Sequence, residues 1–192
     1  MAKCKACRCD YTKTRSFQQA CSIECALKVA QAKREQAERK EARESNRKDR
    51  KRREEMKTLP TLKKEAQREF NRYVRLRDVG RCCISCGLSM GSQQAGGSID
   101  AGHYRSVGSA PQLRFNEDNC HAQCKHCNQY LAGNPIRYRD GLVQRIGLER
   151  LAALESNSEC LHLSRAEVRE IRDTYRAKAN ALSKIVEALC AV

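Results

Sequence analysis

The chain has 192 residues, of which 32% are charged and only 5% are aromatic, with no tryptophan. So little apolar bulk argues against one large hydrophobic core, and we expect small folded units stabilised by bound metal. The formal net charge of +15 favours a polyanionic partner, usually nucleic acid, with a merely basic soluble protein as the alternative.

Cysteine usage indicates the compartment. There are 13 cysteines, and the first residues are not followed by the apolar run of a signal peptide. No stretch approaches the roughly 20 apolar residues of a membrane span. CxxC pairs in such a chain are typical of zinc ligands in a reducing compartment rather than of disulfides. We therefore expect a cytoplasmic protein without membrane contact.

Residues 1–27 are predicted to form a zinc finger. A CxxC pair is followed, after thirteen residues, by a CxxxC pair, so the ligands would be Cys4, Cys7, Cys21 and Cys25. The segment has too few large apolar residues to fold unaided, and structural Zn²⁺ would supply the folding free energy. Cys9 is left over, and a set of unliganded thiols is the alternative interpretation.

Residues 28–60 are predicted to be a basic polar helix or linker. Good helix formers dominate up to residue 57, but they leave no apolar stripe that could fill a core. Residues 26–79 contain 19 Lys and Arg against 10 Asp and Glu, a net +9 of the chain's +15. We expect a DNA-binding arm that follows phosphates, with a solvated spacer helix as the alternative. Its most densely basic part comprises Arg47, Lys48, Arg50, Lys51, Arg52 and Arg53.

A central unit is expected over residues 61–135. Pro60 should break the preceding helix, and a leading helix with one apolar face is predicted over residues 62–78. The rest of this unit should contain a Gly- and Ser-rich loop at 87–98, a short strand at 99–104 and a return strand at 113–115.

Residues 136–192 are predicted to be mostly helical. Asn134 should cap a helix that ends at Gly147, and a short helix should follow over 148–154. Ser164 and Glu167 form a capping box that opens the last helix. The apolar stripe of that helix could form a coiled coil or dock onto the same chain. The stripe consists of Val168, Ile171, Tyr175, Ala179, Leu182, Ile185 and Leu189.

Two further CxxC pairs bracket the central stretch, and they predict a second structural zinc site. Because four thiolates fill all positions of a tetrahedral zinc ion, such a site has no open position for catalysis. It would clamp the two ends of the stretch together. The ligands would be Cys83, Cys86, Cys124 and Cys127.

The residues that this clamp would bring together can hydrolyse phosphodiesters. Asp100 and Asn128 offer a carboxylate and an amide oxygen, which suit Mg²⁺ or Mn²⁺. His103 could take the proton from an attacking water, and Asn119 could orient its imidazole or support the loop. The alternative is a solvated aspartate and a structural histidine.

Other polar residues near the second pair have several interpretations. His121 and His126 could support the zinc ligands, contact phosphate or act as bystanders. Arg105 and Arg114 could bind the scissile phosphate of DNA or form surface salt bridges.

The order Asp-x-x-His and then CxxC-Asn, between zinc knuckles, resembles the ββα-metal (HNH) nucleases, specifically the endonuclease VII class of phage junction resolvases. The resemblance implies that Asp100 and Asn128 hold the catalytic metal and that His103 activates water, while Asn119 matches the middle asparagine of the HNH pattern. The chain departs in having Asn128 where many HNH enzymes have a final histidine, and in the inserted loop.

Nearly the whole chain is similar to the NinG (Rap) family of lambdoid phages. The similarity covers the first cysteine unit, the basic helix and residues 81–87, 100–106 and 119–131. It implies a structure-specific endonuclease that cuts branched DNA, such as Holliday junctions and D-loops, in phage homologous recombination. It also implies the host cell cytoplasm and recombination proteins as possible partners.

We therefore expect an α+β fold: a small zinc-braced ββα-metal core flanked by helices, with an N-terminal Cys4 zinc finger. The hypothesis is a Mg²⁺-dependent DNA endonuclease. Because a junction has near two-fold symmetry and needs paired cuts, a homodimer through the last helix or the basic arm is expected. The alternatives are a zinc-finger DNA-binding accessory protein without catalytic activity and an RNA-binding accessory factor.

Overall fold

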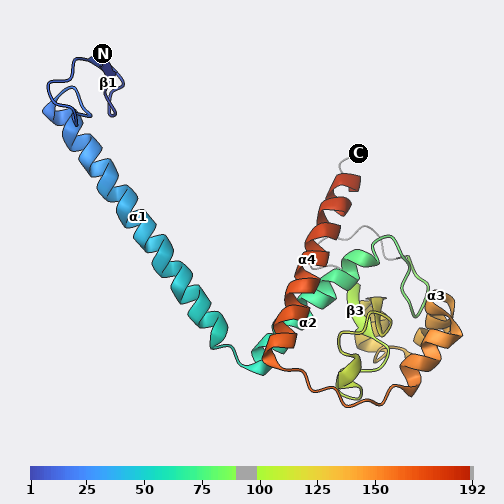
Figure 1. The fold of residues 1–192 in the computed structure, drawn as a ribbon. Helices are drawn as coiled ribbons and strands as arrows, with labels where there is room; N and C mark the ends of the chain where they lie inside the picture. Colours follow the sequence, from blue (N-terminus) through green and yellow to red (C-terminus); the bar gives the residue numbers. More distant parts are fainter. Residues whose placement is uncertain (90–98, 191–192) are drawn as a thin grey trace. The chain divides into compact units, whose positions relative to one another are not determined.

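A computed structural model describes residues 1–89 and 99–190 (Figure 1). The chain divides into two compact units, one spanning Met1–Lys57 and one beginning at Thr58. Small sheets and several helices make it an α+β protein, as predicted. Most of the loop expected at 87–98 lies outside the described residues.

The first unit consists of a small hairpin and one long helix. Strands β1 (Ala2–Lys3) and β2 (Asp10–Tyr11) pair antiparallel, and helix α1 spans Ile23–Glu55. The Ser22 side chain caps α1 by accepting from the backbone N–H of Cys25 at 3.2 Å. None of the 33 residues of α1 is buried, which confirms that this helix is polar on all sides.

The second unit opens with helix α2 (Leu59–Arg77), which begins three residues earlier than predicted. Thr58 caps this helix; the predicted break between the two helices is present, but it lies before Pro60, which belongs to the first turn of α2. Proline is tolerated there because the first backbone N–H groups of a helix have no intrahelical acceptor.

Helix α4 (Arg165–Cys190) packs along α2 within this unit (Figure 1). Its predicted capping box is confirmed: the Ser164 backbone donates to Glu167 Oε2 at 2.8 Å, and the Glu167 backbone donates to Ser164 Oγ at 3.3 Å. Val168 is buried against α2, and the Tyr175 ring meets Phe70 edge-on with centroids 4.8 Å apart. The apolar stripe therefore docks onto the same chain over its N-terminal part.

The sheet of the second unit consists of strands β3 (Ile99–His103) and β4 (Cys120–Cys124). They pair antiparallel, with Ile99 opposite Cys124 and His103 opposite Cys120. The predicted strand at 99–104 is confirmed, but the return strand predicted at 113–115 is wrong. Leu113 instead ends a 3₁₀ turn, η1 (Pro111–Leu113), and its side chain is buried in a cluster with helix α3 (Pro135–Ser156).

Two helical segments follow β4: a single π-helical turn, η2 (His126–Tyr130), and helix α3 (Pro135–Ser156). Gly147, with φ 81° and ψ 166°, divides α3 into the two helices that were predicted. Asn134 occupies the predicted N-cap position, with proline in the first turn, but it is left-handed with φ 48° and its side chain makes no capping hydrogen bond. Its amide instead lies 3.8 Å from the sulfur of Cys127.

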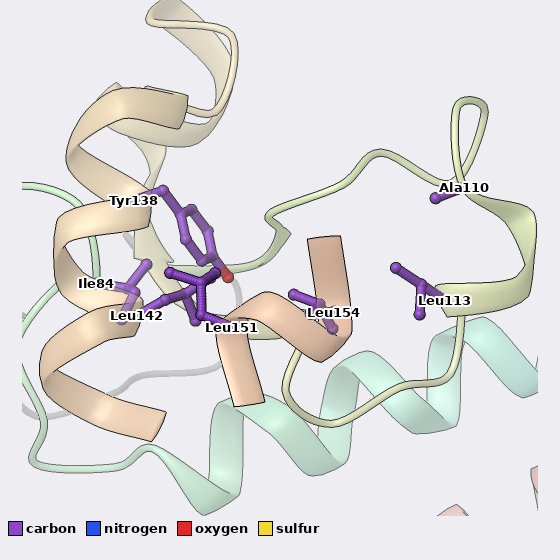
Figure 2. Packing of buried hydrophobic residues seen from close by; sticks show 7 residues of the cluster. All are labelled: Ile84, Ala110, Leu113, Tyr138, Leu142, Leu151 and Leu154. Atoms are coloured by element: carbon purple, nitrogen blue, oxygen red, sulfur yellow. The ribbon is translucent and has the colours of Figure 1, made fainter. Parts of the chain in front are cut away.

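Helix α3 is held against the sheet and the first zinc knuckle (residues 83–86) by an apolar cluster. Figure 2 shows Ile84, Leu142 and Leu151 gathered near the Tyr138 ring, with Leu154 next to the 110–113 turn. The Tyr138 hydroxyl donates to Gly102 O on β3 at 2.8 Å and accepts from His121 N on β4 at 3.0 Å. One buried side chain therefore joins α3 to both strands.

A buried carboxylate joins the end of α2 to β4. Asp78 is 1% exposed, and its oxygens accept from the Arg77 guanidinium and from the backbone N–H of Ala122, each at 2.9 Å. Burial alone would raise the pKa of Asp78, but hydrogen bonds from His121 and Arg77 outweigh it and hold that pKa well below its usual range. Among the described residues, no helix is both long and apolar enough to cross a membrane.

Candidate functional site

The second cysteine tetrad forms as predicted. The sulfurs of Cys83, Cys86, Cys124 and Cys127 all lie within 4.8 Å of one another. Burial would raise the pKa of Cys83, but backbone N–H groups pointing at its sulfur, including that of Cys124 at 3.3 Å, lower it to about 7. Four clustered sulfurs, one already disposed to ionise, fit a closed structural zinc site.

The first unit contains the other predicted tetrad. The sulfurs of Cys4, Cys7, Cys21 and Cys25 also lie within 4.8 Å of one another. Backbone hydrogen bonding at Cys7 is the main reason why the pKa of Cys4 falls to about 6. Cys9 lies outside the tetrad, as expected.

The clamp at the second tetrad brings Asp100 and Asn128 into contact. Asn128 Nδ2 donates to Asp100 Oδ2 at 2.9 Å, although the two residues are 28 positions apart. Gln129 Nε2 donates to the same oxygen at 2.8 Å. Asp100 comes from β3 and both amides come from η2, the turn that directly follows β4. Gln129 was missed from sequence, because an amide next to a recognised motif residue gives no pattern of its own.

Gln123 and Gly102 fix how closely η2 approaches β3. Gln123 Nε2 donates to Ser85 Oγ at 2.7 Å and to Gly133 O at 2.6 Å, which joins the first knuckle to the end of η2. A Cβ at Gly102 would lie 2.1 Å from Gln123 Oε1 and 3.2 Å from Asn128 Oδ1. A larger residue at this position of β3 would therefore have to displace the Gln123 side chain, which two hydrogen bonds hold in place.

His103 lies at the other end of β3, and its contacts are on the α2 side. Its Nε2 is 3.0 Å from the backbone oxygen of Arg114, its Nδ1 is 3.6 Å from Cys120 Sγ, and its ring centroid is 6.1 Å from that of Phe70. An N–H on Nε2 that donates to the carbonyl leaves the lone pair on Nδ1. Burial lowers the pKa of His103, so the imidazole is neutral at pH 7.

Asn119 is fully buried and supports the loops around His103. Its Oδ1 accepts from the backbone N–H of Arg105 at 2.8 Å. Its Nδ2 donates to the backbone oxygens of Arg105, at 2.9 Å, and Leu113, at 3.2 Å. Of the two roles considered for Asn119, these contacts correspond to loop support next to the Arg114 carbonyl.

The two candidate phosphate-binding arginines differ in their contacts. The Arg105 guanidinium donates to the backbone oxygens of Leu154, Glu155 and Asn157, at the end of α3. Arg114 is half-buried, and its guanidinium has no hydrogen-bond or ion-pair partner among the described residues. Burial lowers the pKa of Arg114, which is the expected state of a cation that lacks an anion.

The two histidines near the second zinc knuckle (residues 124–127) differ in burial: one is buried and the other is exposed. His121 is buried in the Asp78 cluster: its Nδ1 lies 3.0 Å from Arg77 Nη2, and its Nε2 lies 3.1 Å from Asp118 O. His126 is exposed on η2 and stacks on Tyr130. The basic side chains predicted to form a DNA-binding arm are all exposed on α1: Arg47, Lys48, Arg50, Lys51, Arg52 and Arg53.

Comparison with known proteins identifies the family. The family model described as "Bacteriophage Lambda NinG protein" matches residues 1–187. The protein named "Protein ninG" of Escherichia phage lambda is 44% identical over 173 residues, which cover 84% of this chain and 82% of that protein. Its namesake in Salmonella phage P22 is 43% identical, with coverage of 84% and 83%. No solved structure matches this chain significantly. The chain therefore belongs to the NinG family of lambdoid phage proteins.

Proposed function

We propose that this protein is a divalent-metal-dependent DNA endonuclease that cuts branched DNA in phage recombination. The main support is the contact between Asp100 on β3 and Asn128 on η2, at the edge of a two-stranded sheet braced by a cysteine tetrad. A strand pair followed by a helical turn, with these residues on it, is the arrangement that the resemblance to ββα-metal nucleases implies.

The donor set around Asp100 fits a hard cation. Its carboxylate faces two amide side chains, Asn128 and Gln129, and rotation of an amide group turns its oxygen toward the same point. Mg²⁺ or Mn²⁺ bound there would supply electrostatic stabilisation of the charge that develops on the phosphoryl group and on the leaving oxygen.

His103 fits the role of general base. With Nε2–H donated to the Arg114 carbonyl, Nδ1 can accept a proton from a water molecule that attacks phosphorus. A pKa lowered by burial keeps this nitrogen unprotonated at neutral pH. Arg114 directly follows the turn η1. Its guanidinium has no partner among the described residues and would suit a phosphate oxygen of the substrate.

The preference for branched DNA and the homodimer are further parts of the proposal. Paired cuts in a junction of near two-fold symmetry favour two copies of the active site. Ile185, in the C-terminal part of α4, is 55% exposed although it belongs to the apolar stripe, which supports that part of α4 as the dimer surface. The exposed basic side chains of α1 would contact phosphates.

A DNA- or RNA-binding accessory protein without catalytic activity is the second candidate. It is favoured by the surroundings of His103, whose Nδ1 lies close to the buried thiol of Cys120. Burial raises the pKa of Cys120, so this thiol stays protonated and can donate weakly to Nδ1. In that case the imidazole would be structural, and Asp100→Asn would change binding at most.

The deciding experiment incubates the protein with a labelled four-way junction, a matched linear duplex and a matched RNA, with Mg²⁺, with Mn²⁺ or with no added divalent metal. Junction cutting that depends on Mg²⁺ or Mn²⁺ is expected, with loss in His103→Ala. His162→Ala is the matched control, because His162 is exposed and lies outside the site. Junction binding without cutting under either metal would leave a binding protein.

A further inference from the structure

We propose that His126 and Tyr130 form a stacking platform for a DNA base exposed at a branch point. The inference rests on the proposed function, since it names the feature of branched DNA that the same site recognises. It concerns the outward side of η2, whereas the candidate metal ligands Asn128 and Gln129 are on the side that faces Asp100.

The two rings already stack on one another. His126 and Tyr130 are four residues apart on η2, their centroids are 6.0 Å apart and their planes differ by 26°. This offset arrangement is favourable for aromatic pairs and leaves an outer face available. Tyr130 is 78% exposed, so most of its surface is accessible to a third ring.

Tyr130 also differs from the other tyrosines of the second unit. Each of those uses its hydroxyl in a hydrogen bond that joins elements of the fold, whereas Tyr130 has no hydrogen-bond partner among the described residues. Apart from the stack on His126, no contact among the described residues therefore explains an aromatic residue at this position. The four structural tyrosines are Tyr73, Tyr104, Tyr138 and Tyr175.

The charge around the platform suits a nucleic acid strand. Residues 119–139 contain no Asp or Glu, so no carboxylate of this segment repels phosphate. Lys125 precedes the pair in the chain and Arg137 follows it; both are exposed, and neither has an acidic partner in the described part of the chain. Aromatic rings flanked by free cations are the combination that binds unpaired nucleotides, with rings for the bases and cations for the backbone.

The position next to Asn128 relates the platform to substrate choice. Bases of a continuous duplex are already stacked on their neighbours, and taking one out costs a few kcal/mol. A base at a branch point has lost part of that stacking and can reach an external ring at a lower cost. The platform therefore favours branched over linear DNA. It lies on η2, the same helical turn that carries the candidate metal ligands.

The test measures binding in Ca²⁺ without Mg²⁺, with 2-aminopurine placed at the branch point of a four-way junction or at the same sequence position in a linear duplex. For the wild type we expect a change in 2-aminopurine fluorescence with the junction alone. Tyr130→Leu should weaken junction binding by about 5- to 150-fold and abolish that change, because base–aromatic stacking is lost. Duplex affinity should be unchanged, and Tyr130→Phe should bind like the wild type.

Ile136→Ala is the matched control, because Ile136 is also 78% exposed and lies just beyond the platform. A zinc content equal to that of the wild type shows that each variant is folded. The proposal is overturned if Tyr130→Leu binds the junction as tightly as the wild type, or if it loses duplex binding to the same extent. Parallel assays in Mg²⁺ separate the two proposals: cutting without a Tyr130 effect retains the nuclease alone, and a Tyr130 effect without cutting retains the platform alone.

Discussion

The Nε2 atom of His103 lies 3.0 Å from the backbone oxygen of Arg114, 11 residues further along the chain. A carbonyl accepts only from a protonated ring nitrogen, so this contact fixes the tautomer that leaves Nδ1 as the basic atom. The backbone oxygen of the neighbouring residue, Leu113, accepts a hydrogen bond from the Asn119 side-chain amide. The orientation of the imidazole therefore depends on a turn that Asn119 holds in place.

Asn119→Ala should reduce cutting through the position of His103. The change removes three hydrogen bonds and leaves buried or partly buried backbone groups without these partners, which should cost about 1–3 kcal/mol of unfolding free energy. With the turn loosened, kcat should fall while KM for the junction stays close to the wild-type value. Asn180→Ala, which removes a single exposed hydrogen bond from Arg72 at 2.8 Å, is the control for both urea unfolding and cleavage.

The pH dependence of cutting should reflect the lowered pKa of His103. The protonated imidazole cannot accept a proton from water, so kcat/KM falls as the pH drops through this pKa. Because burial lowers the pKa below the ordinary value of about 6.5, the acid limb should lie below pH 6.5. The stability of the fold should change with pH in the same direction. The contribution of His103 to the free energy of unfolding is fully present above the pKa that this histidine has in the unfolded chain, and it is lost as the pH falls through its lower pKa in the folded protein. An acid limb above pH 6.5, or one unchanged in His103→Ala, would contradict the assignment.

Local signals in the sequence predicted several parts of this fold correctly. The capping box of Ser164 and Glu167, the break at Gly147 and the two cysteine tetrads each depend on residues whose geometry is set by near neighbours or by a metal's ligand number. The contact between Asp100 and Asn128 followed from the second tetrad, because a clamp on four cysteines limits where the stretch between them can go.

The errors arose where tertiary packing overrides local preference. Strand β4 reads Cys-His-Ala-Gln-Cys, with no alternation of apolar and polar residues, and its burial comes from α2 and α3 on either side. Leu113 looked like part of a strand but is buried in a turn. The roles of Gln129 and of the Arg114 carbonyl could not be predicted, because amides and backbone oxygens become specific only through their spatial partners.

Zinc content should distinguish Cys7 from Cys9, which are two residues apart. Cys7 belongs to the first tetrad and Cys9 does not, so Cys7→Ser should lower the content from two zinc ions per chain to about one, while Cys9→Ser should leave it unchanged. The second unit should keep its zinc and its cutting activity in both variants if the first tetrad serves only its own unit. Metal analysis of the purified proteins measures the content directly.

Gly141→Ala should destabilise the second unit. A Cβ at this position would lie 2.0 Å from the backbone oxygen of Ile84, so either α3 or the first knuckle must move. We expect a loss of at least about 1–3 kcal/mol in urea unfolding, as for overpacked cores. Gly108→Ala is the control, because its Cβ would meet only Ser106 Oγ at 3.8 Å, and it should unfold like the wild type.

Neutralising the basic end of α1 tests whether this helix follows phosphates. In the variant, Arg50, Lys51, Arg52 and Arg53 are replaced by glutamine, which preserves helix propensity while removing four exposed charges. Each phosphate contact that is lost should reduce the slope of log Kobs against log salt by about 0.9 for duplex DNA, because fewer counterions are released on binding. The rate of cutting at saturating protein should not change, since the variant leaves Asp100, His103 and Asn128 intact. An unchanged salt slope, with helix content confirmed by circular dichroism, would instead favour α1 as a solvated spacer helix, because none of its residues is buried in a core.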